Sequence, residues 1–298
     1  MSIRRRLRGR ALSLAASISL LVLPLVSTRA HAATIGVLSG FSYSFTGGSS
    51  PFVSQGATST IPDQGFSSPG AGDGAFGGVA MADFLALRTG GHVSGTANHV
   101  CQCIQIGAEV DLFAVSQDIL HPAAGATTMS ITLSVSGTNS GIGPTSPGTL
   151  LTDARTVLNV VGFDPASAID VDTTGPVVGR TFFRQQAYRA VMVNQQLILT
   201  LPVTSASGVG LWIELISVAQ GSAVAGSFQA ITDFTSTVQI TGIQLFDASG
   251  QPLANPTLTA DSGTLYPLLG VAEPHAAWLL GAAGLAYAMR RRLRASGC

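Results

Sequence analysis

The sequence predicts an all-β exported protein, a β-sandwich of jelly-roll-like form with an N-terminal signal peptide and a C-terminal single transmembrane helix. Short segments that alternate apolar and polar residues recur through the middle of the chain, separated by turns rich in Gly, Ser, Thr and Pro. Apolar runs flanked by arginines lie at both ends. We therefore expect three parts, a signal peptide over 1–32, a β-sandwich cargo domain over 33–268, and a sorting segment over 271–294.

The charge pattern excludes one class of partner. The chain has no lysine, and most of its arginines lie near the two ends. Residues 33–270 carry five arginines and 14 acidic residues, a net charge of −9. An acidic body repels phosphates, so we expect no nucleic-acid partner.

The first 32 residues have the pattern of a secretory signal. An arginine-rich start leads into an apolar run at 11–26, and the small residues Ala30 and Ala32 precede Ala33. An uncleaved membrane anchor is the alternative, but the run is short and contains Pro24. We expect the Sec translocon and signal peptidase to act here, which leaves a mature chain from Ala33 in an oxidising compartment.

The middle of the chain predicts at least eight short strands without intervening helices, which favours a sandwich. A long loop with at most short strands is expected over 47–78 and another loop over 137–148, and 79–87 fits either a helix or a strand. The predicted strands are 34–45, 103–115, 129–135, 156–163, 180–193, 197–203, 209–220 and 236–247.

Strand 103–115 places Ile106 and Val110 toward a core and leaves Glu109 and Asp111 facing solvent. The phase of strand 236–247 changes at Gly242, which predicts a bulge. Residues 247–251 then form a turn with glycine where positive φ is needed.

Cys101 and Cys103 are the cysteines of the predicted mature body. They could form a strained CxC disulfide, link two chains, or remain thiols, and oxidation is the favoured interpretation. Together with His92 and His99 they could bind zinc or copper. Their spacing matches no standard metal site, so ordinary surface histidines beside a disulfide are preferred.

Two groups of acidic residues are candidates for a calcium site and for an acid/base pair. Asp164, Asp170 and Asp172 could ligate calcium, although the sequence there favours a solvated acidic turn. Glu109 and Asp111 share a strand face and could form an acid/base pair, although adjacent exposed carboxylates are common. The sequence has no GxSxG, HExxH or phosphate-binding motif. We therefore expect no catalytic residues, no metal and no cofactor.

The end of the chain combines a turn, an apolar helix and a basic cluster. Val271 precedes Glu273-Pro274, and a helix can begin only after the proline. The 14 uncharged residues 276–289 span about 21 Å as a helix, a marginal membrane anchor. Arg290, Arg291 and Arg292 then provide a positive cytoplasmic stop, although a buried soluble helix is the alternative.

This order resembles the PEP-CTERM sorting signal of exported proteins of Gram-negative bacteria, with Ala272 where the family commonly has proline. The resemblance implies recognition by an exosortase-type transpeptidase and removal of the tail near Glu273-Pro274. It also implies transient anchoring in the inner membrane, then release to the cell surface or extracellular matrix. Segments 80–91, 108–120 and 231–267 are similar to β-rich cargo domains of the same group, which mostly lack a known activity.

The function expected from these features is that of a non-enzymatic cell-surface or matrix protein linked to exopolysaccharide or biofilm. The first alternative is a carbohydrate-binding β-sandwich that stacks sugars on Phe41, Tyr43, Phe45 or Trp212. The second alternative is a secreted polysaccharide hydrolase that uses Glu109 and Asp111.

Overall fold

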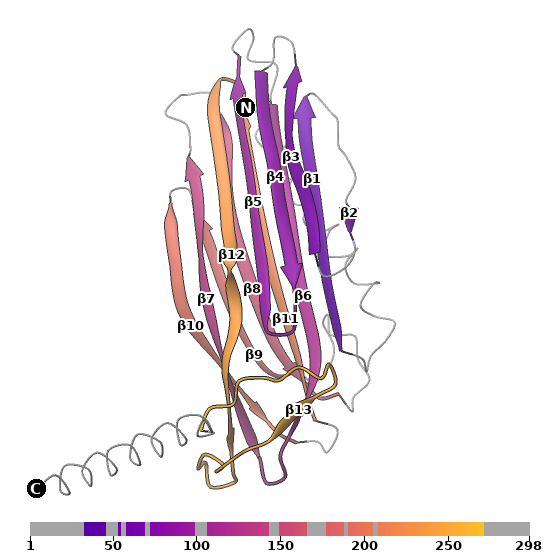
Figure 1. Ribbon diagram of the computed structural model, residues 1–298. Helices are drawn as coiled ribbons and strands as arrows, with labels where there is room; N and C mark the ends of the chain where they lie inside the picture. Colours follow the sequence, from indigo (N-terminus) through magenta and orange to yellow (C-terminus); the bar gives the residue numbers. More distant parts are fainter. Residues whose placement is uncertain are drawn as a thin grey trace, which may run out of the picture.

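The computed structural model describes residues 33–45, 53–54, 58–68, 72–98, 106–142, 149–165, 177–187, 190–204 and 208–270. These residues form a β-sandwich-like body of two sheets with mostly antiparallel neighbours (Figure 1). No helix among them is long and apolar enough to span a membrane. The predicted signal peptide and the predicted tail helix lie outside the described residues.

The first sheet has seven strands and the second has six. The first follows the order β2 (Val53–Ser54), β1 (Thr34–Phe45), β6 (Ile106–Pro122), β11 (Val209–Ala223), β8 (Thr149–Phe163), β9 (Val177–Ala187), and β13 (Leu258–Ala260) also pairs with β6. The second follows the order β10 (Val191–Pro202), β7 (Thr128–Ile142), β12 (Gly226–Phe246), β5 (Ala86–Ala97), β4 (Gly72–Ala82), β3 (Thr58–Ser68).

Strands β5 to β12 pair as one ribbon folded back on itself. Strand β5 pairs with β12, β6 with β11, β7 with β10 and β8 with β9, all antiparallel. Two further pairings, β8 with β11 and β7 with β12, complete the sheets. Strands β1 to β4 extend the two sheets on the other side of β6 and β5.

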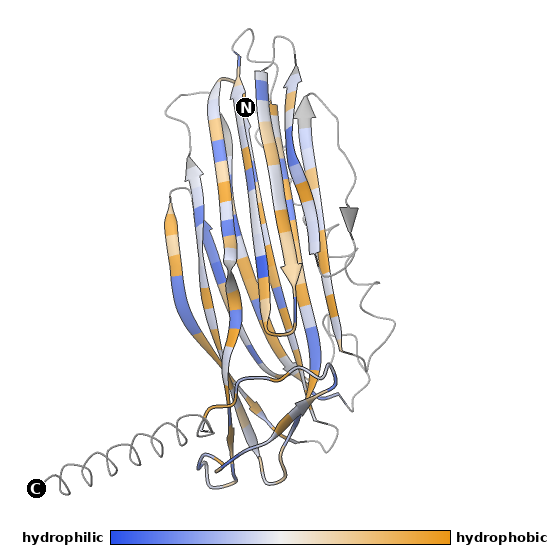
Figure 2. Ribbon diagram, viewed as in Figure 1, coloured by the Kyte–Doolittle hydropathy of each residue, from blue (hydrophilic) through white to orange (hydrophobic). Residues whose placement is uncertain are grey.

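The core lies between the two sheets because every second side chain points inward. Figure 2 shows the resulting alternation of apolar and polar residues along many of the strands. The inward residues belong to one large apolar cluster that draws on both sheets. Its fully buried members include Phe76, Leu87, Leu112, Met129, Ile131, Leu133, Leu158, Leu215 and Phe234.

Several predicted elements are confirmed. Residues 34–45 form β1, and the segments 129–135, 156–163 and 209–220 lie within longer strands. The bulge is present, since the register of β12 against β7 shifts between Ile240 and Gly242. Gly250 adopts φ 76° in the predicted turn.

The long loop predicted over 47–78 is wrong, because β3 and the first part of β4 lie there. Several inward positions of β4 hold glycine, which hides the apolar alternation of that strand from the sequence. Phe66 fills the space in front of Gly74, and Leu112 of the facing sheet fills the space in front of Gly78. Large side chains of the neighbouring strand β3 and of the facing sheet therefore supply the apolar surface that β4 lacks at its glycines.

Three other boundaries differ from the prediction. Strand β7 continues through the expected loop as far as Ile142. The single strand predicted over 180–193 is two, because β9 ends at Ala187 and β10 begins at Val191. The ambiguous segment 79–87 contains the end of β4 and the start of β5, joined where Asp83 accepts hydrogen bonds from the backbone of Leu85 and Ala86.

Gly221→Ala should destabilise the sandwich by about 1–3 kcal/mol, since overpacking of a core costs that much. A Cβ at Gly221 would lie 2.1 Å from Cδ2 of the buried Phe228. Gly36→Ala, on β1 of the same sheet, is the matched control because no atom lies within 4 Å of its added Cβ. Denaturant unfolding of both variants tests this, and equal stabilities would contradict the packing argument.

Candidate functional site

The segment that follows β12, residues 247–270, folds back over one end of the sandwich (Figure 1). We call this segment the C-terminal clamp. It supplies β13, which pairs antiparallel with the end of β6. The backbone N–H of Ala123 also donates to the carbonyl of Thr257, and that of Asp261 donates to the carbonyl of Ile119. The clamp thus covers the end of β6 over several consecutive residues.

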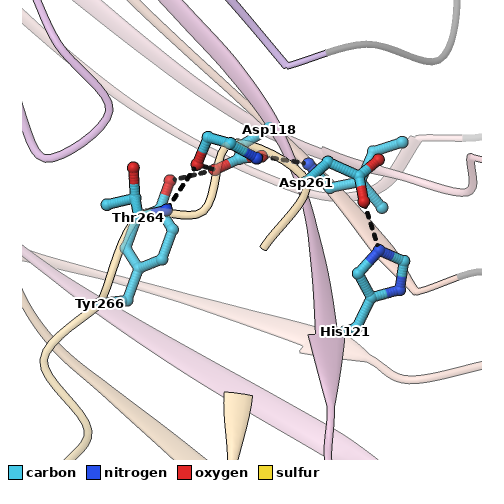
Figure 3. A network of polar contacts seen from close by, with 7 residues as sticks. Asp118, His121, Asp261, Thr264 and Tyr266 are labelled. Carbon is cyan, nitrogen blue, oxygen red and sulfur yellow. Dashed lines mark hydrogen bonds and ion pairs between the residues drawn. The ribbon is translucent and has the colours of Figure 1, made fainter. Parts of the chain in front are cut away.

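The buried carboxylate of Asp118 on β6 holds the clamp in place (Figure 3). It accepts hydrogen bonds from the backbone and hydroxyl of Ser262 and, at 2.8 Å, from the hydroxyl of Tyr266. The backbone N–H of Ile119 donates to the same carboxylate at 2.9 Å. These four donors replace the water that burial removes, so the buried oxygens of Asp118 are satisfied by hydrogen bonds.

The hydroxyl of Tyr266 acts as a donor over the whole working pH range. Burial, followed by the negative charge of Asp118 and the hydrogen bond to it, raises the pKa of Tyr266 above its ordinary value. The hydroxyl of Ser262 also accepts a hydrogen bond from the backbone of Thr264 at 3.1 Å. Each polar group in this network therefore fixes the conformation of the next one.

A second polar contact of the clamp is partly exposed to solvent (Figure 3). Nε2 of His121, three residues after Asp118, lies 2.7 Å from Oδ1 of Asp261. Because both side chains are more than a third exposed, this pair contributes little to stability. The hydrogen bonds of Asp118 therefore hold the clamp more strongly than the contact between His121 and Asp261.

The clamp ends with the chain tied to β12. The backbone of Leu269 donates to the carbonyl of Ile243 at 2.8 Å, and the backbone of Ile243 donates to the carbonyl of Pro267 at 2.7 Å. A parallel bridge joins Ile243 and Leu268. The clamp is therefore tied to β12 as far as Leu269.

Asp118→Asn should loosen the clamp and lower the unfolding free energy by about 1–3 kcal/mol, because an amide leaves buried donors without their acceptor. Hydrogen exchange should rise at 258–269, and thermal unfolding should occur earlier. Asp247→Asn is the matched control, since Asp247 also accepts bonds from a serine and from backbone N–H groups but lies at an exposed turn. Unchanged exchange at 258–269 in Asp118→Asn would contradict the proposed role.

The carboxylates predicted as an acid/base pair lie on the outward face of the first sheet. Glu109 on β6 and Asp153 on β8 both pair with Gln220 on β11. Two residues further along the same strands, Asp111 on β6 and Arg155 on β8 both pair with one residue of β11. Gln220 Nε2 donates to Glu109 at 3.5 Å, and Gln186 Nε2 on β9 donates to Asp153 at 3.1 Å. We call Glu109, Asp111, Asp153 and Arg155 the acidic cluster.

The expectation that Glu109 and Asp111 face solvent is wrong for Asp111. Its exposed fraction is 5%, and that of Asp153 is 7%. Strand β6 lies inside the sheet between β1 and β11, so neighbouring side chains crowd both flanks of each outward residue. A polar position in an alternating strand indicates which face it occupies, but not how far that face is covered.

Burial changes the ionisation of this pair. Loss of water on burial, followed by the charge of Glu109, raises the pKa of Asp111 to about 8, although Arg155 acts in the opposite direction. Burial also raises the pKa of Glu109, against the lowering effect of Arg155. At neutral pH the pair therefore holds a proton that two solvated carboxyls would release.

Two carboxyls that share a proton could act as an acid and a base. Metal ligands and a cavity are the other features that a catalytic site commonly has. Among the described residues no group of three or more His, Cys, Asp or Glu side chains could hold a metal ion. A hollow of about 450 Å³ on the second sheet is lined mainly by glycine, hydroxyl and amide groups, with Asp73 as its one carboxylate. It lies on different strands from the acidic cluster.

The stability of the protein should fall as pH rises from about 4 to 8, because over this window the unfolded Asp111 is ionised while the folded one keeps its proton. Asp111→Asn cannot ionise, so it should gain at least about 1 kcal/mol relative to wild type between these pH values, where each unit is worth up to about 1.4 kcal/mol. Asp73→Asn, at an exposed position of β4, should track wild type. Parallel pH profiles for all three proteins would show that Asp111 titrates normally.

The remaining predicted sites are only partly within the described residues. Ala33 immediately precedes β1, His92 lies on β5 with Nε2 3.7 Å from Oδ1 of Asp63, and Asp164 follows β8. The structure does not bring these residues together into one site. The following lie outside the described residues: Ala30, Ala32, His99, Cys101, Cys103, Asp170, Asp172, Val271, Glu273, Pro274, Arg290, Arg291 and Arg292.

Two aromatic residues considered for sugar stacking belong to the core. Phe41 stacks on Phe76 with ring centroids 4.6 Å apart, and Tyr43 stacks on Phe66 at 5.7 Å. Trp212 is half-buried on the outward face of β11, and its indole nitrogen has no hydrogen-bond partner among the described residues. The side chain of Phe45 lies outside the described residues.

Sequence reasoning missed the clamp network. Asp118 is separated from Ser262 by 144 residues and from Tyr266 by 148, and no local pattern links them. The signal that was available is an aspartate at 118 within an apolar stretch of strand, since a buried acid requires donors from elsewhere.

Comparison with known proteins adds no family, since no family model matches the chain and a search of curated proteins returns no match.

Proposed function

We propose that this chain is an exported, non-enzymatic surface or matrix protein, sorted through its C-terminal segment. The order Val271, Glu273-Pro274, uncharged helix and arginine cluster carries the proposal. The clamp supports it, because Leu269, which donates a hydrogen bond to Ile243 of β12, lies only a few residues before Glu273. A processing enzyme would meet the motif just beyond a rigid attachment point.

In the proposed route the Sec translocon exports the chain, and signal peptidase cuts it before Ala33. The uncharged segment 276–289 halts in the inner membrane, with Arg290, Arg291 and Arg292 on the cytoplasmic side. An exosortase-type transpeptidase then separates body from tail near Glu273-Pro274. Such a cut would leave every described contact of the clamp on the body side, so release would not unfold the cargo.

We propose further that the body is a jelly roll. Support comes from the ribbon pairing of β5 to β8 with β9 to β12, in which the two halves alternate between the sheets. Rolling up one antiparallel ribbon produces the two Greek keys of that fold. Strands β1 to β4 are then additions at one side of the roll.

Binding of carbohydrate is the alternative function, and one observation favours it. The outward face of β7 presents uncharged hydroxyls at alternate positions, while the intervening residues are buried. Hydroxyls suit contact with a neutral or hydrated exopolysaccharide. Sugar stacking on Phe41 and Tyr43 would require the core to open, so any such contact would rest on polar groups.

Intact mass spectrometry of the protein from its own host tests the sorting proposal. We expect an N-terminus at Ala33 and loss of the arginine tail in the secreted or surface fraction. Glu273→Ala with Pro274→Ala should keep the tail and retain the protein in the membrane fraction. Pro267→Ala, on the body side of the motif, is the control and should be processed as wild type. A secreted protein that still ends at Cys298 would overturn the proposal.

A further inference from the structure

The four sheet edges differ in how they are protected from pairing with other strands. Natural sheets block their edges with short strands, charges, prolines or bulges. At one edge of the first sheet, β2 has two residues, and at the other, β9 presents the exposed Arg180 and Arg184. At one edge of the second sheet, β3 contains Pro62 and a register shift between Ile61 and Gln64.

Strand β10, the remaining edge, has none of these devices along its length. Its 12 residues contain no charge, and its proline is the last of them. It pairs with β7 in continuous register from end to end. Met192 and Ile198 on its outward face have exposed fractions of 84% and 62%, high for apolar residues. A long, regular and apolar edge is suited to the addition of another strand.

The sequence of β10 is complementary to itself when read antiparallel. Its outward face runs Met192, Asn194, Gln196, Ile198, which is apolar, amide, amide, apolar. A two-fold axis at Gln195 sets Met192 opposite Ile198 of a second copy and Asn194 opposite Gln196. On the inward face the same register sets Val191 opposite Leu199 and Val193 opposite Leu197. A slip of two residues in either direction would place an apolar side chain opposite an amide.

The acidic charge of the body does not oppose contact at this edge. The body has a net charge of −9, so most approaches between two copies meet repulsion. Residues 177–204, which include β9 and β10, contain arginines and no acidic residue. Contact along β10 therefore keeps the carboxylates of the two bodies apart.

We propose that β10 pairs antiparallel with β10 of a second copy, about a two-fold axis at Gln195, to join the two second sheets into one. Identical surfaces meet in such an isologous interface, so assembly stops at the dimer. The pairing satisfies the edge backbone and covers Met192 and Ile198 on both copies. This inference goes beyond the sorting proposal, because tail removal leaves β10 unchanged.

Sedimentation velocity of the protein recovered from its host, over a range of concentrations, tests the dimer. Wild type should sediment as a dimer, and Ile198→Lys and Met192→Lys should each raise the dissociation constant at least 10-fold, because a charge on an edge strand opposes pairing. Phe182→Lys is the matched control, since Phe182 is 67% exposed but lies on β9. It should remain dimeric, and thermal unfolding of each variant should show an intact fold.

A wild-type protein that stays monomeric would overturn the proposal, and so would lysine variants of β10 that remain dimeric. Equal dissociation by Phe182→Lys would assign the interface to another surface. Single cysteines test the register, because Gln195→Cys should form a covalent dimer on mild oxidation above the level of the parent protein. Asn194→Cys and Gln196→Cys should form less, and preferential cross-linking of either would exclude the two-fold axis at Gln195.

Discussion

The pairing of β5 to β8 with β9 to β12 is the constraint on which the rest of this structure depends. Once these strands lie antiparallel and alternate between the sheets, every second residue of the ribbon must face the opposite sheet. The core, the glycines that admit large facing side chains, and the crowded position of β6 all follow from that arrangement. The clamp then covers one end of the sandwich, where Asp118 provides polar contacts that apolar packing alone would not supply.

Two buried acids of β6 show how position within one strand sets different chemistry. Asp118 receives four hydrogen bonds, so its buried oxygens have partners inside the protein. Asp111 shares its surroundings with Glu109, so desolvation and a neighbouring acid raise its pKa to about 8. A carboxyl with enough donors stabilises its charged form, whereas one beside another carboxyl retains a proton. The first arrangement serves architecture, and the second makes stability depend on pH.

The sequence was sufficient for the all-β class because apolar alternation is strong in β6, β7, β8 and β11. It was insufficient for β4, where glycine at inward positions removed the signal and the filling side chains came from the neighbouring strand β3 and from the facing sheet. The same separation hid the Asp118 network, whose partners lie more than 140 residues away. Burial of Asp111 was missed for a related reason, since strand order within the sheet decides how crowded an outward face is.

The distribution of charge links the fold to the proposed route of export. Arginines gather at the two ends of the chain, where the proposed route would keep them on the cytoplasmic side, and the body between them is acidic. An acidic body discourages unspecific association between copies, yet the edge of β10 is free of charge and self-complementary. A matrix protein with this charge pattern can therefore remain dispersed during export and still associate in one defined way after its release.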